Sequence, residues 1–366
     1  MPASPVYMLK RCFAALLISL LLTTASEAVT QEDSPKLLLF SAIDVQYLAD
    51  TMKVWGKSTG INGFILAYVA DWWTPKDELF KKLSVLREIN NNGKIYGIDS
   101  NFVKVALSYG NERVGAIPEW TDDRAWSKIV ENFTNIASLI KESDTKGIAI
   151  DTEYYGVSLF NPKSERFNTV DSDLLKRKVR QRGREIMQAM ITVYPDLEII
   201  LLQEGAFWAD RKEKEYVLWP YFYNGLASVH NSKGIILGAE STYSILDKNS
   251  LKARFTQINN AMEKYAQDVS FWNKNCSIAI GMWPLGKEYD NKSARYSSAQ
   301  FKEQLQTAVS LSPRYVWIYG HGAAWWQMTP SELKKYSTKG WIWGKEHQLL
   351  PMDPSIQQYF EITRNR

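Results

Sequence analysis

The sequence predicts an α/β fold, a single (β/α)₈ TIM barrel formed by one domain. Short apolar runs alternate with longer amphipathic stretches, and eight such units follow one another over about 300 residues. No low-complexity segment or linker rich in proline and glycine interrupts the alternation. With 366 residues, of which 45% are hydrophobic, the chain is long enough for one large core.

Each predicted strand is a short apolar run, as expected for parallel strands that are buried on both faces. The runs cover residues 36–44, 63–73, 94–100, 146–153, 197–205, 234–241, 277–283 and 315–322. Helical patterns lie between them, and one of these, residues 76–93, ends in Gly93 directly before the next run. An open doubly wound sheet is disfavoured, because no G-x-G-x-x-G turn follows the first strand.

Residues 1–28 have the pattern of a signal peptide, so the barrel is expected to span residues 29–366. Lys10 and Arg11 precede an apolar run over residues 13–22, and residues 26–28 form a small-x-small cleavage site. The apolar run is too short to span a bilayer comfortably, so no stable membrane insertion is expected after cleavage. The mature protein is therefore predicted to be secreted or periplasmic.

Composition argues against several classes of protein. The net charge is only +4, without a basic block, so no nucleic-acid partner is expected. The chain has 3 histidines and no H-x-H or H-E-x-x-H motif, so neither a metal nor a cofactor is predicted. A carboxylate-only magnesium or calcium site at Asp44, Asp71 and Asp99 remains an alternative.

Polar and aromatic residues end nearly every predicted strand, where a TIM barrel places its active site. The residues at these ends are Asp44, Asp71, Asp99, Asp151 with Glu153, Glu204, Glu240, Trp283 and His321.

Side-chain alternation orients three of these strand ends. In the fourth strand Ala149, Asp151 and Glu153 share one face, while Ile148 and Ile150 share the other. The bulky residues are expected to pack against helices, and the small residues and carboxylates to face the barrel interior. The sixth and seventh strands alternate in the same way and place Glu240 and Trp283 toward the mouth. The fifth strand is apolar on both faces and leaves the direction of Glu204 open.

Aromatic residues make up 13% of the chain, and many follow a predicted strand end. Flat aromatic faces in such loops can stack against sugar rings, so a carbohydrate is the expected partner. The residues expected to bind it are Asp99, Trp72, Tyr155, Glu204, Trp208, Tyr243, Trp283, Tyr319, His321 and Trp325.

Two carboxyl groups across one cavity, one protonated and one ionised, are the requirement for hydrolysis of a glycosidic bond. Asp151 and Glu153 are about 7 Å apart along the strand, close enough to perturb each other's pKa. The sequence therefore predicts a glycoside hydrolase. We expect Glu153 to donate the proton, Asp151 to tune and orient Glu153, and Glu240 to act as nucleophile or base.

The segment GIAIDTE resembles the fourth-strand signature of chitinase-like barrels, D-G-x-D-x-D-x-E. Asp151 and Glu153 match its last two acidic positions, and the resemblance implies that Glu153 is the general acid. Lys146 and Ala149 replace the first two acidic residues. The resemblance therefore indicates a barrel glycoside hydrolase and does not assign a family.

Other layouts of the same chemistry differ in the second carboxylate. A cellulase-like layout needs a glutamate at the end of the seventh strand, which here ends GMWPLG. An amylase-like layout, with Asp151 as nucleophile and Glu204 as acid/base, remains open. A barrel that binds carbohydrate without cleaving it is the alternative from a different functional class.

Overall fold

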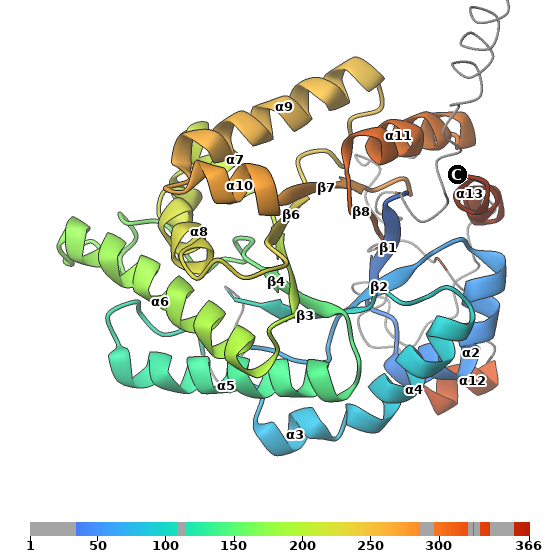
Figure 1. The fold of residues 1–366 in the computed structure, drawn as a ribbon, viewed down its shortest axis with the longest axis horizontal. Coiled ribbons are helices and arrows are strands. Elements are labelled where there is room, and N and C mark those ends of the chain that lie inside the picture. The colour runs from blue at the N-terminus through green and yellow to red at the C-terminus, as the bar shows by residue number, and fades with distance from the viewer. Residues whose placement is uncertain (1–33, 108–114, 286–295, 321–324, 326–329, 337–354) are drawn as a thin grey trace, which may run out of the picture. The chain divides into compact units, whose positions relative to one another are not determined.

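The computed structural model describes residues 34–107, 115–285, 296–320, 325, 330–336 and 355–366. Eight strands form a closed barrel in which every neighbouring pair is parallel, which confirms the predicted (β/α)₈ fold (Figure 1). The strands are β1 (Lys36–Ser41), β2 (Gly63–Leu66), β3 (Phe102–Ala106), β4 (Gly147–Asp151), β5 (Glu198–Leu202), β6 (Ile235–Ala239), β7 (Ser277–Met282) and β8 (Tyr315–Tyr319).

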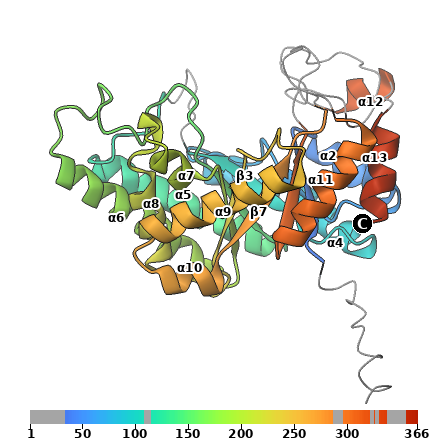
Figure 2. The same cartoon turned by 90° about the horizontal axis from the view of Figure 1, so that it is seen from above.

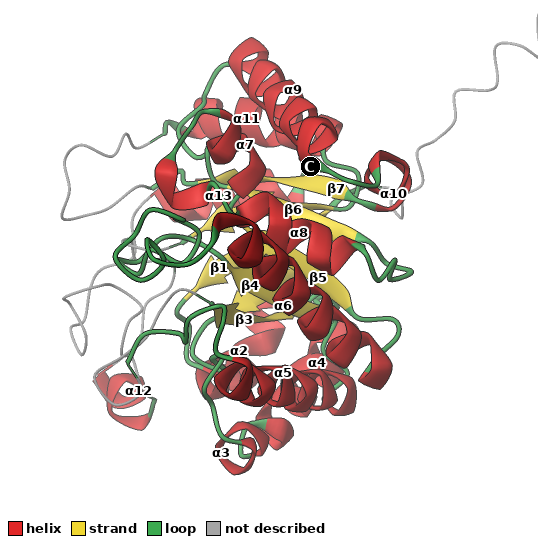
Figure 3. Ribbon diagram, turned by 90° about the vertical axis from the view of Figure 1, so that its left-hand side faces the viewer, coloured by secondary structure: helices red, strands yellow, loops and turns green. Residues whose placement is uncertain are grey.

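Helices form a ring around the strands (Figure 1), and the turned views show helices on opposite sides of the barrel (Figures 2 and 3). They are α2 (Val45–Ser58), α3 (Lys76–Phe80), α4 (Leu83–Ile95), α5 (Asp123–Glu142), α6 (Ser172–Val193), α7 (Gly205–Asp210), the 3₁₀ turn η1 (Lys214–Tyr216), α8 (Trp219–Ala227), α9 (Lys248–Tyr265), α10 (Val269–Asn275), α11 (Ser298–Leu311), α12 (Pro330–Lys335) and α13 (Ser355–Arg364). None of the helices in the described ranges is long and apolar enough to cross a membrane. The predicted signal peptide lies outside the described residues.

Two separate apolar clusters fill the two sides of the barrel wall. Alternate residues of the strands form the inner cluster, which includes Ala149 and Ala279. Ile148 and Ile150 belong to the outer cluster, which packs against the helices. The alternation predicted for the fourth and seventh strands is thus confirmed. Small interior residues leave room for large ones: a Cβ on Gly281 would lie 2.9 Å from the Trp317 ring.

The third strand lies further along the chain than the sequence suggested. Helix α4 continues through Gly93 to Ile95, and β3 begins only at Phe102. Gly93 permits a close approach to the neighbouring chain, because a Cβ there would lie 2.3 Å from the Ile98 carbonyl oxygen. The left-handed turn is made by Gly97, with φ 78°. The predicted strand over residues 94–100 was therefore wrong, and Asp99 precedes β3.

Candidate active site

Asp151, the last residue of β4, is buried at the C-terminal end of the barrel and is surrounded by donors. One of its carboxylate oxygens lies 2.9 Å from Lys104 Nζ and accepts a hydrogen bond from the Tyr155 hydroxyl at 2.8 Å. The other oxygen accepts the backbone N–H of Glu153 at 3.0 Å. With both oxygens engaged, Asp151 is suited to orienting its neighbours rather than to attacking a substrate.

Lys104 is a site residue that sequence reasoning missed, because the third strand was placed too early. It lies two residues after Phe102, a member of the inner cluster, and so shares the interior face of β3. Burial alone would lower the pKa of Lys104, but the charges of Asp151 and Asp71 outweigh burial and raise it. The side chain is therefore a permanent ammonium ion, with Nζ 5.7 Å from the Tyr155 ring centroid.

Asp71, in the loop after β2, is the third charged member of this group. Burial raises the pKa of its carboxyl group to about 6, the charge of Asp151 adds to the rise, and Lys104 opposes it. Asp71 therefore titrates near neutral pH beside a fixed cation.

Glu204 follows β5 and is completely buried. Its two carboxylate oxygens accept the backbone N–H groups of Glu240, at 2.8 Å, and Ser241, at 2.9 Å. Burial raises the pKa of Glu204, although the hydrogen bonds from residues 240 and 241 oppose that rise. Gln203, immediately before it, has a left-handed backbone conformation with φ 71°. Glu204 thus holds the segment after β6 in place, and its oxygens are directed at the backbone instead of at a ligand.

Glu240 follows β6 and is partly buried. Burial raises its pKa well above the ordinary range, and the negative charges of Glu153, Asp151 and Glu204 raise it further. These interactions place Glu153, after β4, within electrostatic reach of Glu240. The Glu240 carboxyl group therefore holds its proton more tightly than an isolated glutamate does.

An aromatic wall, formed by Tyr243, Trp283 and Tyr319, stands beside these carboxyl groups. The rings of Tyr243 and Tyr319 are stacked, with centroids 5.3 Å apart and planes 8° from parallel. Trp283 meets both rings edge-on, 5.1 Å from Tyr319 and 5.8 Å from Tyr243. All three side chains are partly buried, so the wall keeps some of its surface open. The structure thus brings the predicted residues Asp151, Glu153, Glu240, Tyr155, Tyr243, Trp283 and Tyr319 to one end of the barrel.

Other predicted binding residues lie elsewhere. Asp99 pairs with Lys36, the first residue of β1, at 3.3 Å, and so lies at the opposite end of the barrel. Trp72 is buried in the outer core and packs edge-on against Trp73. Trp325 is only 1% exposed and packs against α13. These three residues are therefore not grouped with the carboxyl groups: the strand boundary before Asp99 was misplaced, and the two tryptophans pack in the core.

Two further predicted binding residues are Trp208 and His321. Trp208 lies in α7, partly buried, with its ring edge-on to Phe207 at 5.1 Å. His321 lies outside the described residues.

A metal site is not apparent in the part of the chain that the structure describes, where no three His, Cys, Asp or Glu residues are grouped to hold an ion. The three aspartates of the carboxylate-only alternative are used separately. Asp44 caps α2 by accepting the backbone N–H groups of Gln46 and Tyr47, and Asp99 lies at the far end. Only Asp71 belongs to the carboxylate group described above.

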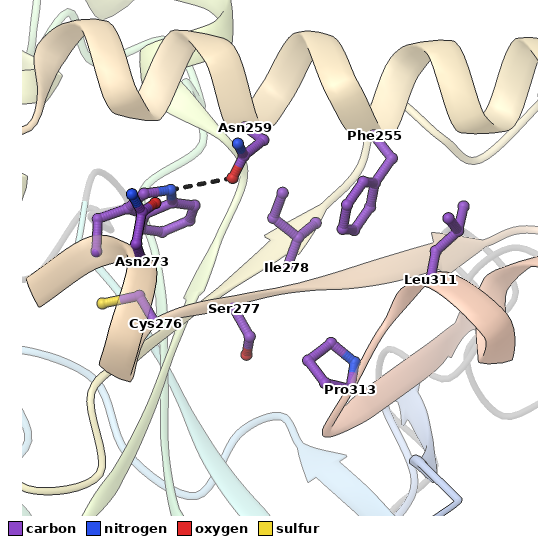
Figure 4. Close-up of a pocket in the computed structure, with 9 residues that line it drawn as sticks. Phe255, Asn259, Asn273, Cys276, Ser277, Ile278, Leu311 and Pro313 are labelled. Carbon is purple, nitrogen blue, oxygen red and sulfur yellow. Dashed lines mark hydrogen bonds between the residues drawn. The ribbon is translucent and has the colours of Figure 1, made fainter. Parts of the chain in front are cut away.

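A separate cavity of about 230 Å³ lies near Ser277, the first residue of β7, at the N-terminal end of the strands (Figure 4). Its lining is uncharged and includes Phe255 and Asn259 of α9 and Cys276. Burial raises the pKa of the Cys276 thiol, which keeps it protonated. Because its lining is uncharged and its thiol is protonated, this cavity lacks the carboxyl groups that the barrel mouth provides.

No protein-family model and no curated protein matches the chain. Among solved structures, it is similar to GH5_18 from Streptomyces cattleya, determined in complex with GlcNAc: TM-score 0.54, 10% identity, 91% of this chain and 80% of that chain covered. It is also similar to the exo-β-1,4-mannosidase Op5Man5 from Opitutaceae bacterium strain TAV5: TM-score 0.50, 10% identity, 91% and 59% covered. The chain thus shares the (β/α)₈ fold of glycoside hydrolases, and its family is unassigned.

Proposed function

We propose that the protein is a glycoside hydrolase that cleaves O-glycosidic bonds of an oligo- or polysaccharide. The observation that supports this most directly is the pairing of Glu240 and Glu153. Burial and the charge of Glu153 both raise the pKa of Glu240, at the mouth of a barrel beside an aromatic wall. Two such carboxyl groups are what the reaction requires.

The charges around the pair favour a division of roles that reverses the one expected from the sequence. Glu240 carries the proton and gives it to the leaving glycosidic oxygen as the C1–O bond breaks. Glu153 acts opposite, either by bonding to C1 as nucleophile or by taking a proton from the water that attacks C1. Because the charge of each carboxylate opposes ionisation of the other, one proton serves the pair, and we assign it to Glu240.

The neighbouring residues maintain this arrangement. Asp151 accepts the Glu153 backbone N–H, and Glu204 accepts that of Glu240, so each reacting residue is tied to a buried carboxylate. Because these two carboxylates are already engaged by the protein, we do not assign them the amylase-like roles of nucleophile and acid/base. They position the pair instead.

Reducing-sugar release from glycan substrates tests the proposal. The panel would contain hexaoses of β-1,4-linked glucose, mannose, xylose and N-acetylglucosamine, together with an α-1,4-glucan. Glu240→Gln and Glu153→Gln should each lower kcat at least about 10³-fold on any cleaved substrate. Glu303→Gln, an exposed carboxylate on α11, is the control and should leave kcat unchanged.

The outcomes separate the classes of function. Cleavage that survives both substitutions would refute the assigned roles. Binding of a hexaose by the wild type without any cleavage would favour the carbohydrate-binding barrel. Reducing ends that appear with Glu240→Gln but not with Glu153→Gln would show that Glu240 does not donate the proton.

We also propose that the protein is exported and that residues 1–28 are removed. The charged, apolar and small-residue regions of this segment support the proposal. Mass spectrometry of the protein recovered outside the cytoplasm would test it. A mature N-terminus at residue 29 is expected, and a protein that retains residues 1–28 would contradict it.

A further inference from the structure

Tyr68 lies in the turn after β2 with an unusual backbone conformation. Its φ is 59°, in the left-handed region, and its side chain is 58% exposed. A bulky residue is rarely found with positive φ, because its Cβ crowds the backbone. Strain of this kind is typical of positions whose conformation serves function.

The other largely exposed aromatic residues in the described part of the chain are Tyr154 and Tyr155. Both follow β4, so all three exposed aromatic residues lie in loops at the C-terminal end of the barrel. The remaining described aromatic residues are buried or partly buried. Exposure of aromatic surface is thus concentrated beside the proposed active site.

Tyr68, in the loop after β2, lies beside the strand that carries Lys104, because β2 pairs with β3. Its phenol contributes to the raised pKa of Lys104, as do Asp151 and Asp71. Lys104 Nζ lies 2.9 Å from Asp151 and 5.7 Å from the Tyr155 ring centroid. A cation, a carboxyl group that titrates and two exposed rings therefore gather around the ends of β2, β3 and β4.

We propose that Tyr68 is the platform of a second sugar subsite, whose hydroxyl-binding groups are Lys104 and Asp71. An ammonium ion donates and a carboxylate accepts hydrogen bonds, and together they suit neighbouring hydroxyl groups of a sugar ring. The aromatic wall of Tyr243, Trp283 and Tyr319 comes from β6, β7 and β8, and forms a different subsite. The substrate is accordingly an oligosaccharide that occupies both.

This inference depends on the proposed function for its ligand, but its test does not depend on catalysis. Isothermal titration with the four β-1,4-linked hexaoses and their monosaccharides measures binding. Tyr68→Asn should weaken binding of a recognised hexaose roughly 3- to 10-fold, whereas monosaccharide binding should not change. Tyr68→Phe keeps the ring and should stay within about twofold of the wild type.

Thermal unfolding of the same variants provides a second readout. Asparagine tolerates positive φ, so Tyr68→Asn should keep the Tm of the wild type or raise it by about 2 °C. Lys212→Asn, with φ 63° in the segment between α7 and η1, is the control for backbone conformation. It should change Tm in the same direction without affecting hexaose binding.

A lower Tm with undiminished hexaose affinity would overturn the inference and make Tyr68 a structural residue. Equal weakening of hexaose and monosaccharide binding would also overturn it, because one shared site would then suffice. If the wild type binds none of the hexaoses or monosaccharides, the inference fails together with the proposed function. If the wild type binds a hexaose and Tyr68→Asn binds it equally well, the inference fails while the proposed function stands.

Discussion

Lys104 of β3 and Asp151 of β4 form an ion pair inside the barrel mouth, with 2.9 Å between Nζ and a carboxylate oxygen. The Asp151 side chain is 2% exposed and that of Lys104 is 18% exposed. Both charged groups are largely removed from water, so each depends on the other to offset its lost hydration. The pair joins two adjacent strands at the point where the reacting residues begin.

Removing the cation from this pair should destabilise the protein. Lys104→Met leaves Asp151 buried without its counter-charge, and we expect a loss of about 3 kcal/mol in the free energy of unfolding. Urea denaturation at neutral pH measures it. Lys176→Met removes an exposed ion pair with Asp173 on α6 and should cost less than about 1 kcal/mol. Equal losses for the two variants would contradict a specific role for the buried pair.

Glu204 should affect catalysis through Glu240. Glu204→Gln places an amide N–H₂ against a backbone N–H and removes one hydrogen bond, at a cost of about 1–3 kcal/mol. Because Glu240 is then less well held, kcat should fall more than 10-fold at 25 °C, where the variant is still folded. Glu198→Gln is the control: Glu198 is also a buried carboxylate, bound to Arg314 and Tyr315, but it begins β5 at the opposite end. Activity lost to the same extent in both variants would indicate general destabilisation instead.

Asp71 should make stability depend on pH in a definite direction. Its pKa is raised from 3.8 to about 6 in the folded protein, so between these values the folded state binds more protons than the unfolded state. The stability that Asp71 contributes is therefore present at pH 4, falls as pH rises toward about 6, and levels off above it. Asp71→Asn lacks this dependence, so the Tm of the variant should rise relative to that of the wild type between pH 4 and 7. A constant difference in Tm across this range would refute the assigned pKa.

The alkaline limit of activity should follow the charges around Glu240. The negative charge of Asp151 helps to raise the Glu240 pKa, and Lys104 opposes it. Asp151→Asn removes the former and leaves the latter, so the Glu240 pKa should fall. We expect the alkaline limb of kcat/KM against pH to move down by about one pH unit. A limb that stays in place would show that Glu240 does not carry the donated proton.

The sequence alone was sufficient to predict the barrel and the end at which Asp151, Glu153 and Glu240 gather. Apolar runs with helical stretches between them predict parallel strands covered by helices. The folded chain has this arrangement. Alternation in the fourth strand also placed Ala149 inside and Ile148 outside, because adjacent residues of a strand face opposite sides.

Tertiary structure decided which polar residues meet. A misjudged strand boundary concealed Lys104, since Gly93 resembles a helix end until its close approach to Ile98 is known. The sequence could not show that Glu204 binds the backbone of residues 240 and 241, because that contact joins segments 36 residues apart. It could not distinguish Trp325, buried against α13, from an open platform. The local sequence pattern determines secondary structure and the side of a strand on which each side chain lies. The burial, the contacts and the pKa of a side chain depend on neighbours that only the folded chain brings together.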